Sequence, residues 1–337
     1  MHKRVIHRVL SALSCLFVFC PTTSYGLDKV RVGLSSVTGI MGSIWVAEEK
    51  KIFQKYGIEP EVIIIGGGGA RGVSALIAGD IQFSTGAGDA FVRASLKGAD
   101  VVMAASIVTK GLQRVMTRPE LKTPEDLKGK KIAITRFGSA SHRVLRIMLE
   151  RWGIRPDELQ AIQVGSSPAM LVNLDKGAVD AAILSMPSFF VAADKGYRVF
   201  ADLGEMDIYS LQNALSSTKQ YLQMHRDVAV RFIKAYVEGV AYYKKHKQET
   251  LEVLRKKLRI DSGQKADLRY LESSYELLAK KYYAPVPYPS VKGVESILEF
   301  LAEEDPKIKK PNAKLFINDS IVREIEASGF IDAIYGK

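Results

Sequence analysis

The first half of the chain contains an approximate repeat, whose two copies lie about a hundred residues apart. The first copy begins at residues 29–33 (KVRVG) and the second at residues 131–135 (KIAIT). Each copy reads strand, helix, strand, helix, strand, with small residues in the turn after each strand. Two similar α/β lobes predict a cleft between them, because ligands favour interdomain clefts and the carboxyl ends of parallel strands.

Residues 1–26 have the pattern of a secretory signal peptide. A start with three Lys and Arg residues precedes the apolar run 9–19, and residues 24–26 (SYG) suit a cleavage site with small residues. We expect the mature chain to begin at Leu27 and to be periplasmic or otherwise exported. An uncleaved membrane anchor is the alternative, although the apolar run is shorter than the ~20 residues of a spanning helix.

Both cysteines, Cys15 and Cys20, lie in this leader, so lipidation there is a further alternative. A mature chain without cysteine has no disulfides, no thiolate chemistry and few routes to a structural zinc site. Three of the 48 Lys and Arg residues fall in the leader, which leaves 45 against 37 Asp and Glu and a net charge of +8. This charge favours anionic solutes in a general way. The basic residues form no arginine-rich tract, so nucleic acid is not an expected partner.

About 310 mature residues suit two lobes better than one core. The chain is expected to cross between the lobes near residues 110–116 and to return from Val199 and Phe200 towards 210–217, which would hinge the lobes. The tail reads as helices that pack back on the first lobe, near residues 248–258, 265–281, 291–303 and 320–327. The predicted segments are a signal peptide over 1–26, lobe I over 27–113, lobe II over 114–205, and the return to lobe I with the C-terminal helices over 206–337.

The turns that follow the strands are the main candidates for ligand binding. Each precedes a predicted helix, whose N-terminus offers unpaired N–H groups and a partial positive charge suited to an anion. Glycine and serine also let a ligand approach the backbone closely. The alternative is that every parallel α/β fold needs small residues in such turns. The six turns span residues 35–39, 66–69, 86–89, 137–139, 166–168 and 185–188.

Two arginines and one aromatic residue join these candidates. Arg136 could hold an oxyanion through two hydrogen bonds or belong to a surface ion pair. Arg71, in the first turn of its helix, is a weaker cationic candidate, and Arg143 is expected on a solvated helix face. Phe137 could stack on a planar ligand or belong to the core.

Catalysis finds little support in the sequence. The chain has no nucleophile elbow, no His-Glu-x-x-His and no nucleotide-binding glycine spacing, and its mature histidines lack metal-ligand spacing. We therefore expect no cofactor, no metal and no enzymatic activity.

Four segments carry a resemblance to a known family: residues 29–33 (KVRVG), 57–62 (GIEPEV), 76–83 (LIAGDIQF) and 123–134 (TPEDLKGKKIAI). Together they resemble the periplasmic solute-binding proteins of nitrate/sulfonate/taurine-type ABC importers, which share the thiamine-precursor-type binding domain. The resemblance covers about residues 30–245 and fits the tail only loosely. It implies an α/β, two-lobed periplasmic binding fold of type II, each lobe a mostly parallel sheet flanked by helices, with a helical C-terminal extension.

The resemblance also implies a function and a site. We predict an exported binding protein, monomeric, that captures a small anionic or polar heteroaromatic solute by hinge closure and delivers it to a membrane permease with a separate ATPase subunit. An exported ligand sensor and an enzyme on the same fold are the alternatives. The first two turns do not match a taurine, sulfonate or nitrate pocket, so the ligand stays open. The predicted ligand-binding residues are Ser36, Thr38, Gly39, Gly67, Gly68, Gly69, Arg71, Gly86, Ala87, Arg136, Phe137, Gly138, Ser139, Ser166, Ser185 and Pro187.

Overall fold

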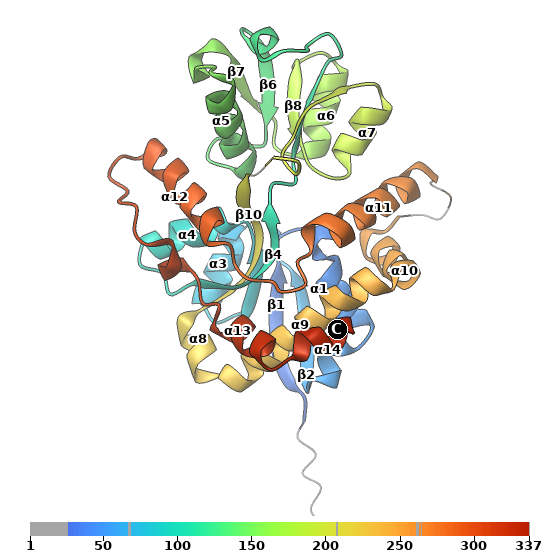
Figure 1. Cartoon of the computed structure of the whole chain (residues 1–337), viewed down its shortest axis with the longest axis vertical. Helices are drawn as coiled ribbons and strands as arrows, with labels where there is room; N and C mark the ends of the chain where they lie inside the picture. The colour runs from blue at the N-terminus through green and yellow to red at the C-terminus, as the bar shows by residue number, and fades with distance from the viewer. Residues whose placement is uncertain (1–25, 67–68, 207, 261–262, 264, 337) are drawn as a thin grey trace, which may run out of the picture.

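The computed structural model describes residues 26–66, 69–206, 208–260, 263 and 265–336. Two lobes stand one above the other, each built on a five-stranded sheet flanked by helices (Figure 1). The predicted signal peptide lies, except for Gly26, outside the described residues. Within the described ranges, no helix is both long enough and apolar enough to cross a membrane.

The sheet of lobe I has the strand order β2-β1-β3-β10-β4. Strand β1 pairs in parallel with β2 and β3, and β10 runs antiparallel between β3 and β4. The alternating residues Val30, Val32 and Leu34 of β1 are fully buried, as expected for a strand covered by helices. The strands are β1 Asp28–Leu34, β2 Ile58–Ile64, β3 Phe83–Gly86, β4 Val102–Lys110 and β10 Tyr209–Ser217.

The sheet of lobe II repeats this plan with the order β7-β6-β8-β5-β9. Strand β6 pairs in parallel with β7 and β8, and β5 runs antiparallel between β8 and β9. In both sheets the first strand of the sequence repeat is flanked by the second and the third. This correspondence confirms the predicted fold class. The strands are β5 Arg114–Thr117, β6 Lys131–Ile134, β7 Gln160–Gln163, β8 Ala181–Leu184 and β9 Arg198–Asp202.

Helix α9, Arg226–Lys245, is the main helix of the lobe I core. It buries Phe232 and Tyr236, whose spacing of four residues predicts one helical face. The Phe232 ring stacks on Phe83 of β3 at 4.2 Å between ring centroids, and the Tyr236 hydroxyl donates to the Ser106 carbonyl of β4 at 2.8 Å. These contacts fix the sequence-distant helix α9 against the sheet.

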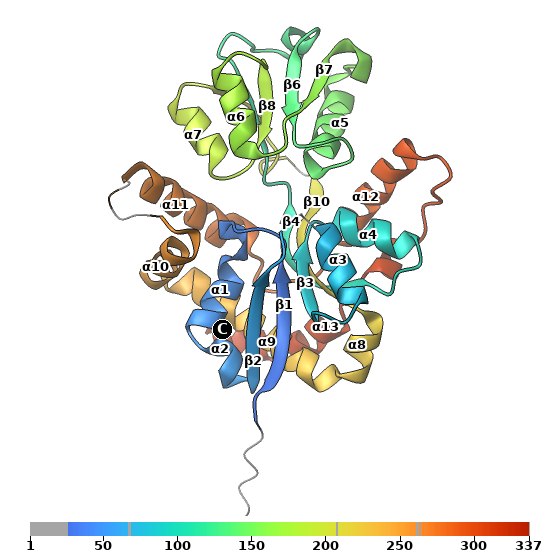
Figure 2. The ribbon, with the colours of Figure 1, turned by 180° about the vertical axis from the view of Figure 1, so that it is seen from behind.

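The predicted helices of the tail are present, together with two short helices that the sequence does not predict, α8 and α14. Helices α11 and α12 rise on opposite flanks of lobe I, beneath α7 and α5 of lobe II respectively (Figures 1 and 2). The helices are α1 Gly42–Glu49, α2 Ile52–Lys55, α3 Gly69–Ile77, α4 Gly88–Leu96, α5 Ala140–Trp152, α6 Ser167–Asp175, α7 Ser188–Asp194, α8 Lys219–Met224, α9 Arg226–Lys245, α10 Lys247–Leu258, α11 Lys265–Leu277, α12 Val291–Glu304, α13 Ser320–Ala327 and α14 Phe330–Tyr335. Short helical turns are η1 Gly39–Met41, η2 Pro124–Leu127, η3 Pro156–Glu158, η4 Leu278–Tyr282 and η5 Ala313–Phe316.

The two passages between the lobes lie side by side. One joins β4 to β5 and the other joins β9 to β10, and the Leu203 N–H donates to the Gln113 carbonyl across them at 3.2 Å. The expectation that Val199 and Phe200 begin the return is wrong. Both residues lie in β9, where hydrogen bonding to β5 keeps them in the sheet of lobe II.

Candidate functional site

The glycine turns of lobe I pack tightly against one another. A Cβ placed on Gly86 would lie 2.8 Å from the Gly69 Cα, and one placed on Gly69 would lie 2.5 Å from the Ala90 Cβ and 3.4 Å from the Ala87 carbonyl oxygen. Side chains at Gly69 and Gly86 would therefore clash. The predicted residues Gly67 and Gly68 lie outside the described residues.

The first turn of lobe I is held from two sides. The Ser35 N–H donates to the Thr85 Oγ1 at 3.0 Å, and the hydroxyls of Ser36 and Thr38 lie 3.4 Å apart. The hydroxyl of Tyr283, from the C-terminal region, donates to the Ile40 carbonyl at 2.7 Å. The turn that carries Ser36, Thr38 and Gly39 is thus anchored both to the sheet and to the tail.

The turn before α5 in lobe II combines exposed side chains with an internal hydrogen-bond network. Arg136 and Phe137 are exposed, Phe137 at 54%. The Gly138 N–H donates to the His142 Nδ1 at 3.1 Å. Ser139 caps the helix, and its hydroxyl lies 2.7 Å from that of Thr135. The network orders the turn and uses part of the hydrogen-bonding capacity that a ligand could engage.

The remaining predicted residues of lobe II lie near one another. Ser166 caps α6 by accepting from the Ala169 N–H at 3.3 Å, and the Ser185 N–H donates to the Ser167 Oγ at 2.9 Å. Pro187 follows in the same exit turn and is exposed.

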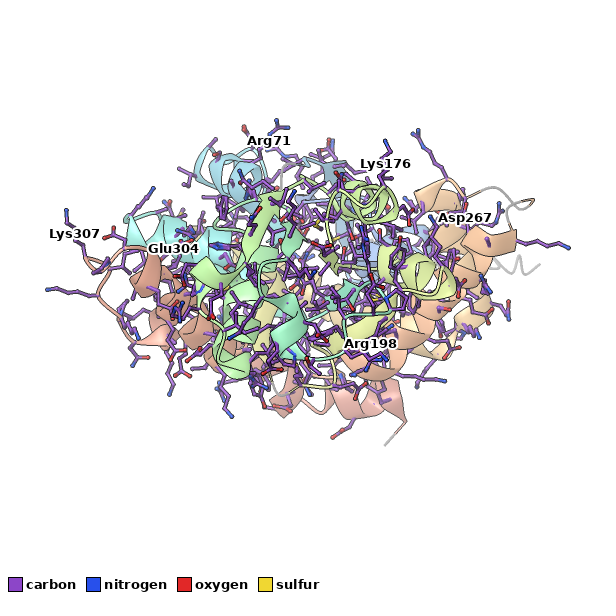
Figure 3. All side chains as sticks on the ribbon, turned by 90° about the horizontal axis from the view of Figure 1, so that it is seen from above. Arg71, Lys176, Arg198, Asp267, Glu304 and Lys307 are labelled. Atoms are coloured by element: carbon purple, nitrogen blue, oxygen red, sulfur yellow. The ribbon has the colours of Figure 1, made fainter. Side chains whose placement is uncertain are left out.

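Arg71 projects from α3 at the edge of the molecule and is exposed (Figure 3).

Arg143 is buried, and the expectation of a solvated position for it is wrong. Only 1% of Arg143 is exposed, because the helices of lobe I cover this part of α5. Its Nε and Nη2 lie 3.1 Å and 3.3 Å from the two carboxylate oxygens of Asp89 on α4. The pair joins the lobes.

The contact between α5 and α12 extends this junction. The His142 ring meets Phe300 edge to face at 5.6 Å, and Arg146 pairs with Glu303 at 3.2 Å. Burial lowers the pKa of His142, and the nearby Arg146 lowers it further, while Glu304 opposes the shift. The neutral ring is therefore favoured at this interface.

A cavity of about 280 Å³ lies on the opposite flank, between the two lobes. Lobe I contributes the first turn and residues of α9, α10, α11 and η4, and lobe II contributes residues in and just before α7. Three of the predicted ligand-binding residues, Thr38, Gly39 and Pro187, line it. The described residues that line the cavity are Val37, Thr38, Gly39, Ile40, Met186, Pro187, Val191, Tyr243, Leu254, Leu258, Ile260, Asp267, Tyr270, Leu271, Ser274 and Leu278.

Helices α7 and α11 are tied together beside this cavity. The Tyr270 hydroxyl donates to the Asp194 Oδ2 at 2.8 Å, and Arg269 pairs with the same carboxylate. In both ribbon views α7 stands directly above α11 (Figures 1 and 2). These bonds hold the two lobes together on this flank.

The contribution of the tail to the cavity is not predicted from the sequence. Tyr243 of α9, Leu258 of α10 and Leu271 of α11 line the cavity, although none of them is a predicted ligand contact. Their only signal is an apolar, tyrosine-containing stripe on each helix, which core packing explains equally well.

Within the part of the chain that the structure describes, no group of three or more His, Cys, Asp and Glu side chains could hold a metal ion. The arrangement instead offers two lobes joined by two adjacent passages, with a largely apolar cavity between them. Such a space binds small molecules by burying most of their surface.

Comparison with solved structures shows the same fold in binding proteins. The periplasmic aliphatic sulphonate binding protein SsuA from Escherichia coli matches with a TM-score of 0.72 and 18% identity, over 87% of this chain and 92% of that one. The periplasmic nitrate-binding protein NrtA from Synechocystis PCC 6803 matches with a TM-score of 0.68 and 14% identity, over 89% of each chain. A ligand-binding component of an ABC-type import system from Staphylococcus aureus matches with a TM-score of 0.68 and 13% identity, over 88% of this chain and 98% of that one.

A search of curated protein sequences found no significant match. A family model described as NMT1/THI5 like matches residues 40–250, which is more than half of the chain and spans both lobes. The repeat, the paired sheets and this match agree, and the chain belongs to the NMT1/THI5-like family.

Proposed function

We propose that the chain is an exported substrate-binding protein of an ABC importer, which captures a small solute between its lobes and delivers it to a membrane permease with a separate ATPase subunit. The observation that carries this proposal is the cavity of about 280 Å³ lined by residues of both lobes. The names of the similar structures, two periplasmic binding proteins and one component of an import system, support it.

The proposed site is this cavity. Thr38 and Gly39 belong to the lobe I wall and Pro187 to the lobe II wall, and all three are among the predicted ligand contacts. The other predicted residues do not line it, among those that the structure describes. In this proposal the turn with Gly138 and Ser139 serves closure, because it and the helix that Ser139 caps meet α12 across the lobes.

The proposed mechanism is capture by closure. A solute that touches both walls binds the closed arrangement better than an open one, so it shifts the population towards closure. The adjacent passages between β4 and β5 and between β9 and β10 allow the lobes to separate as units. The permease would recognise the closed form, and opening would release the solute.

Native mass spectrometry tests the capture of a solute. The chain, expressed with its N-terminal segment and purified without denaturation, should carry an additional small mass that denaturation releases. The released molecule should rebind to stripped protein, raise its melting temperature and be recovered chemically unchanged. Conversion of the molecule on incubation would favour an enzyme. Absence of any bound mass, together with no thermal shift across a broad solute panel, would overturn the proposal.

Export is tested separately by fractionation and N-terminal sequencing. We expect the protein in the exported fraction, beginning at Leu27, and monomeric by light scattering. Retention in the cytoplasm with Met1 intact would contradict the exported role. Recovery of the ligand-bound protein with a membrane kinase instead of a permease, in cross-linked membranes of the native host, would favour a sensor.

A further inference from the structure

The walls of the cavity between α7 and α11 are mostly apolar. Val37 and Ile40 line it from the first turn, Met186 and Val191 from lobe II, and several leucines from α10 and α11. Apolar side chains from both lobes thus converge on one space. A ligand there would gain mainly from removing apolar surface from water.

The described residues that line the cavity offer no cationic partner for an anion. Among the described residues that line it there is no Lys, Arg or His, and Asp267 contributes an acidic group at an exposed position (Figure 3). The Tyr270 hydroxyl is already bonded to Asp194. A carboxylate, sulfonate or nitrate buried here would lose its hydration without gaining a counter-charge, and buried charges are stable only when paired.

One polar atom of the lining is left to be satisfied. Tyr243 is fully buried, lines the cavity, and its hydroxyl has no hydrogen-bond partner in the described structure. Its ring is fixed by stacking on Tyr275 at 5.1 Å and by an edge contact with Tyr283 at 4.8 Å. Burial raises the pKa of Tyr243 well above its ordinary value, so the hydroxyl stays neutral. An unpartnered buried hydroxyl on a side chain that lines an apolar cavity calls for an explanation, and a ligand atom would supply the missing partner.

We propose that this cavity takes an uncharged, mainly apolar molecule that places one hydrogen-bonding group against the Tyr243 hydroxyl. This inference rests on the proposed function and names the class of its solute. It departs from the anionic or polar heteroaromatic solute that the turns predict. The volume of about 280 Å³ suits a molecule of about one substituted ring.

A matched series of probes on one ring tests the charge preference. The probes are 4-methylbenzyl alcohol, 4-methylbenzoate, 4-methylbenzylammonium and p-xylene, titrated at pH 7 by calorimetry into protein stripped of any bound molecule. The alcohol should bind at least about tenfold more tightly than the carboxylate, a difference of ~1.4 kcal/mol. Equal or tighter binding of the carboxylate, or no binding of the alcohol, would overturn the proposed class.

Two variants test the location. Tyr243→Phe keeps the ring packing and removes the hydroxyl, so it should weaken the alcohol by about three- to tenfold and leave p-xylene within about twofold. Val191→Phe fills the cavity from lobe II and should weaken the binding of both the alcohol and p-xylene. Lys176→Ala, at an exposed position on lobe II, is the control and should leave the binding of both probes unchanged (Figure 3).

The pattern of outcomes separates this inference from the function on which it rests. Unchanged binding of the alcohol in both Tyr243→Phe and Val191→Phe would place the ligand elsewhere. A copurified anionic molecule that binds equally well to Val191→Phe would preserve the solute-binding role and refute the uncharged class. Failure of both the probes and the native mass measurement would remove the function and the inference together.

Discussion

The carboxylate of Asp89 in lobe I accepts two hydrogen bonds from Arg143 in lobe II, at 3.1 Å from Nε and 3.3 Å from Nη2. Both residues are buried, with 7% and 1% exposed. A buried ion pair is sensitive to the loss of one member, since the remaining charge stays without its partner. Both charges are kept from water only while the lobes are in contact. The contact between the lobes therefore depends on both members of the pair.

Arg143→Met is expected to destabilise the protein by up to about 3–5 kcal/mol, because it leaves the Asp89 carboxylate without its cation. Separation of the lobes would readmit water and relieve part of this cost. We therefore expect a lower melting temperature together with a larger radius of gyration in small-angle X-ray scattering.

A double variant and a surface control complete this test. Asp89→Leu combined with Arg143→Met removes both charges and should recover most of the lost stability. Arg226→Met breaks the exposed pair with Glu324, whose side chains are 45% and 50% exposed, and should cost no more than about 1 kcal/mol. Equal losses of stability in Arg143→Met and Arg226→Met would show that the interlobe pair contributes no more to stability than an exposed pair.

The burial of Arg143 shows why the sequence predicts the lobes better than their junction. The repeat and the strand and helix periodicities are local signals, and they predict the two sheets and most helices. Whether the polar face of α5 meets water or α4 depends on contacts between lobes, which the periodicity of α5 does not encode. Arg143 therefore looks like a solvated residue in the sequence.

The cavity illustrates the same limit for the candidate site. Thr38, Gly39 and Pro187 were predicted because they follow strands, and strand ends are local features. Tyr243 and Leu271 reach the cavity only because the tail folds back, and the Tyr283–Ile40 hydrogen bond that anchors this return spans most of the chain. Such a long-range contact has no signature in one sequence.

The protonation of His142 should weaken the junction between α5 and α12 in acid. Its pKa is lowered by burial, so the unfolded chain, with an ordinary pKa of about 6.5, takes up the proton first. The stabilisation is then complete above about pH 6.5 and is lost as the pH falls towards the folded pKa. Glu304, Arg146 and Arg93 are the charged groups nearby, and Arg93 already pairs with Glu304.

His142→Asn gives this prediction a matched control. The asparagine Oδ1 can accept from the Gly138 N–H in place of the Nδ1, which accepts at 3.1 Å, but it does not titrate. Melting temperatures from pH 7.5 to pH 5 should fall more steeply in the wild type than in the variant. Parallel slopes for the two proteins would exclude His142 as the source of acid sensitivity.

Gly138 tests how backbone strain at the interlobe turn affects stability. Its φ of +73° disfavours any residue with a Cβ, so Gly138→Ala should cost about 1–2 kcal/mol of unfolding free energy. The added Cβ would meet Glu304 Oε1 at 3.6 Å and Arg93 Nη2 at 3.7 Å, which are ordinary contacts. Strain, not a clash, should therefore set the cost.

Gly153→Ala supplies the comparison. Gly153 ends α5 with a similar φ of +66°, and its Cβ would meet no atom within 4 Å. Urea unfolding should give similar losses for the two variants. A Gly138→Ala loss larger by more than about 1 kcal/mol would show that the junction with α12 is disturbed as well.

Gly239→Ala should destabilise the protein, although helix propensity alone favours this substitution. Alanine gains about 1 kcal/mol over glycine inside a helix. A Cβ at position 239 of α9 would, however, lie 2.7 Å from the Ser43 carbonyl oxygen and 2.8 Å from the Ala47 Cβ, both on α1. Overpacking of this kind costs about 1–3 kcal/mol, so the net effect of Gly239→Ala should be destabilising.

The opposing residue separates overpacking from any other cause. Ala47→Gly removes one of the two atoms that the new Cβ would meet and leaves the Ser43 carbonyl in place. In a double-mutant cycle, the two substitutions together should therefore be less destabilising than the sum of their separate effects. Simple additivity in urea unfolding, or a Gly239→Ala protein more stable than the wild type, would mean that α1 and α9 move apart at little cost.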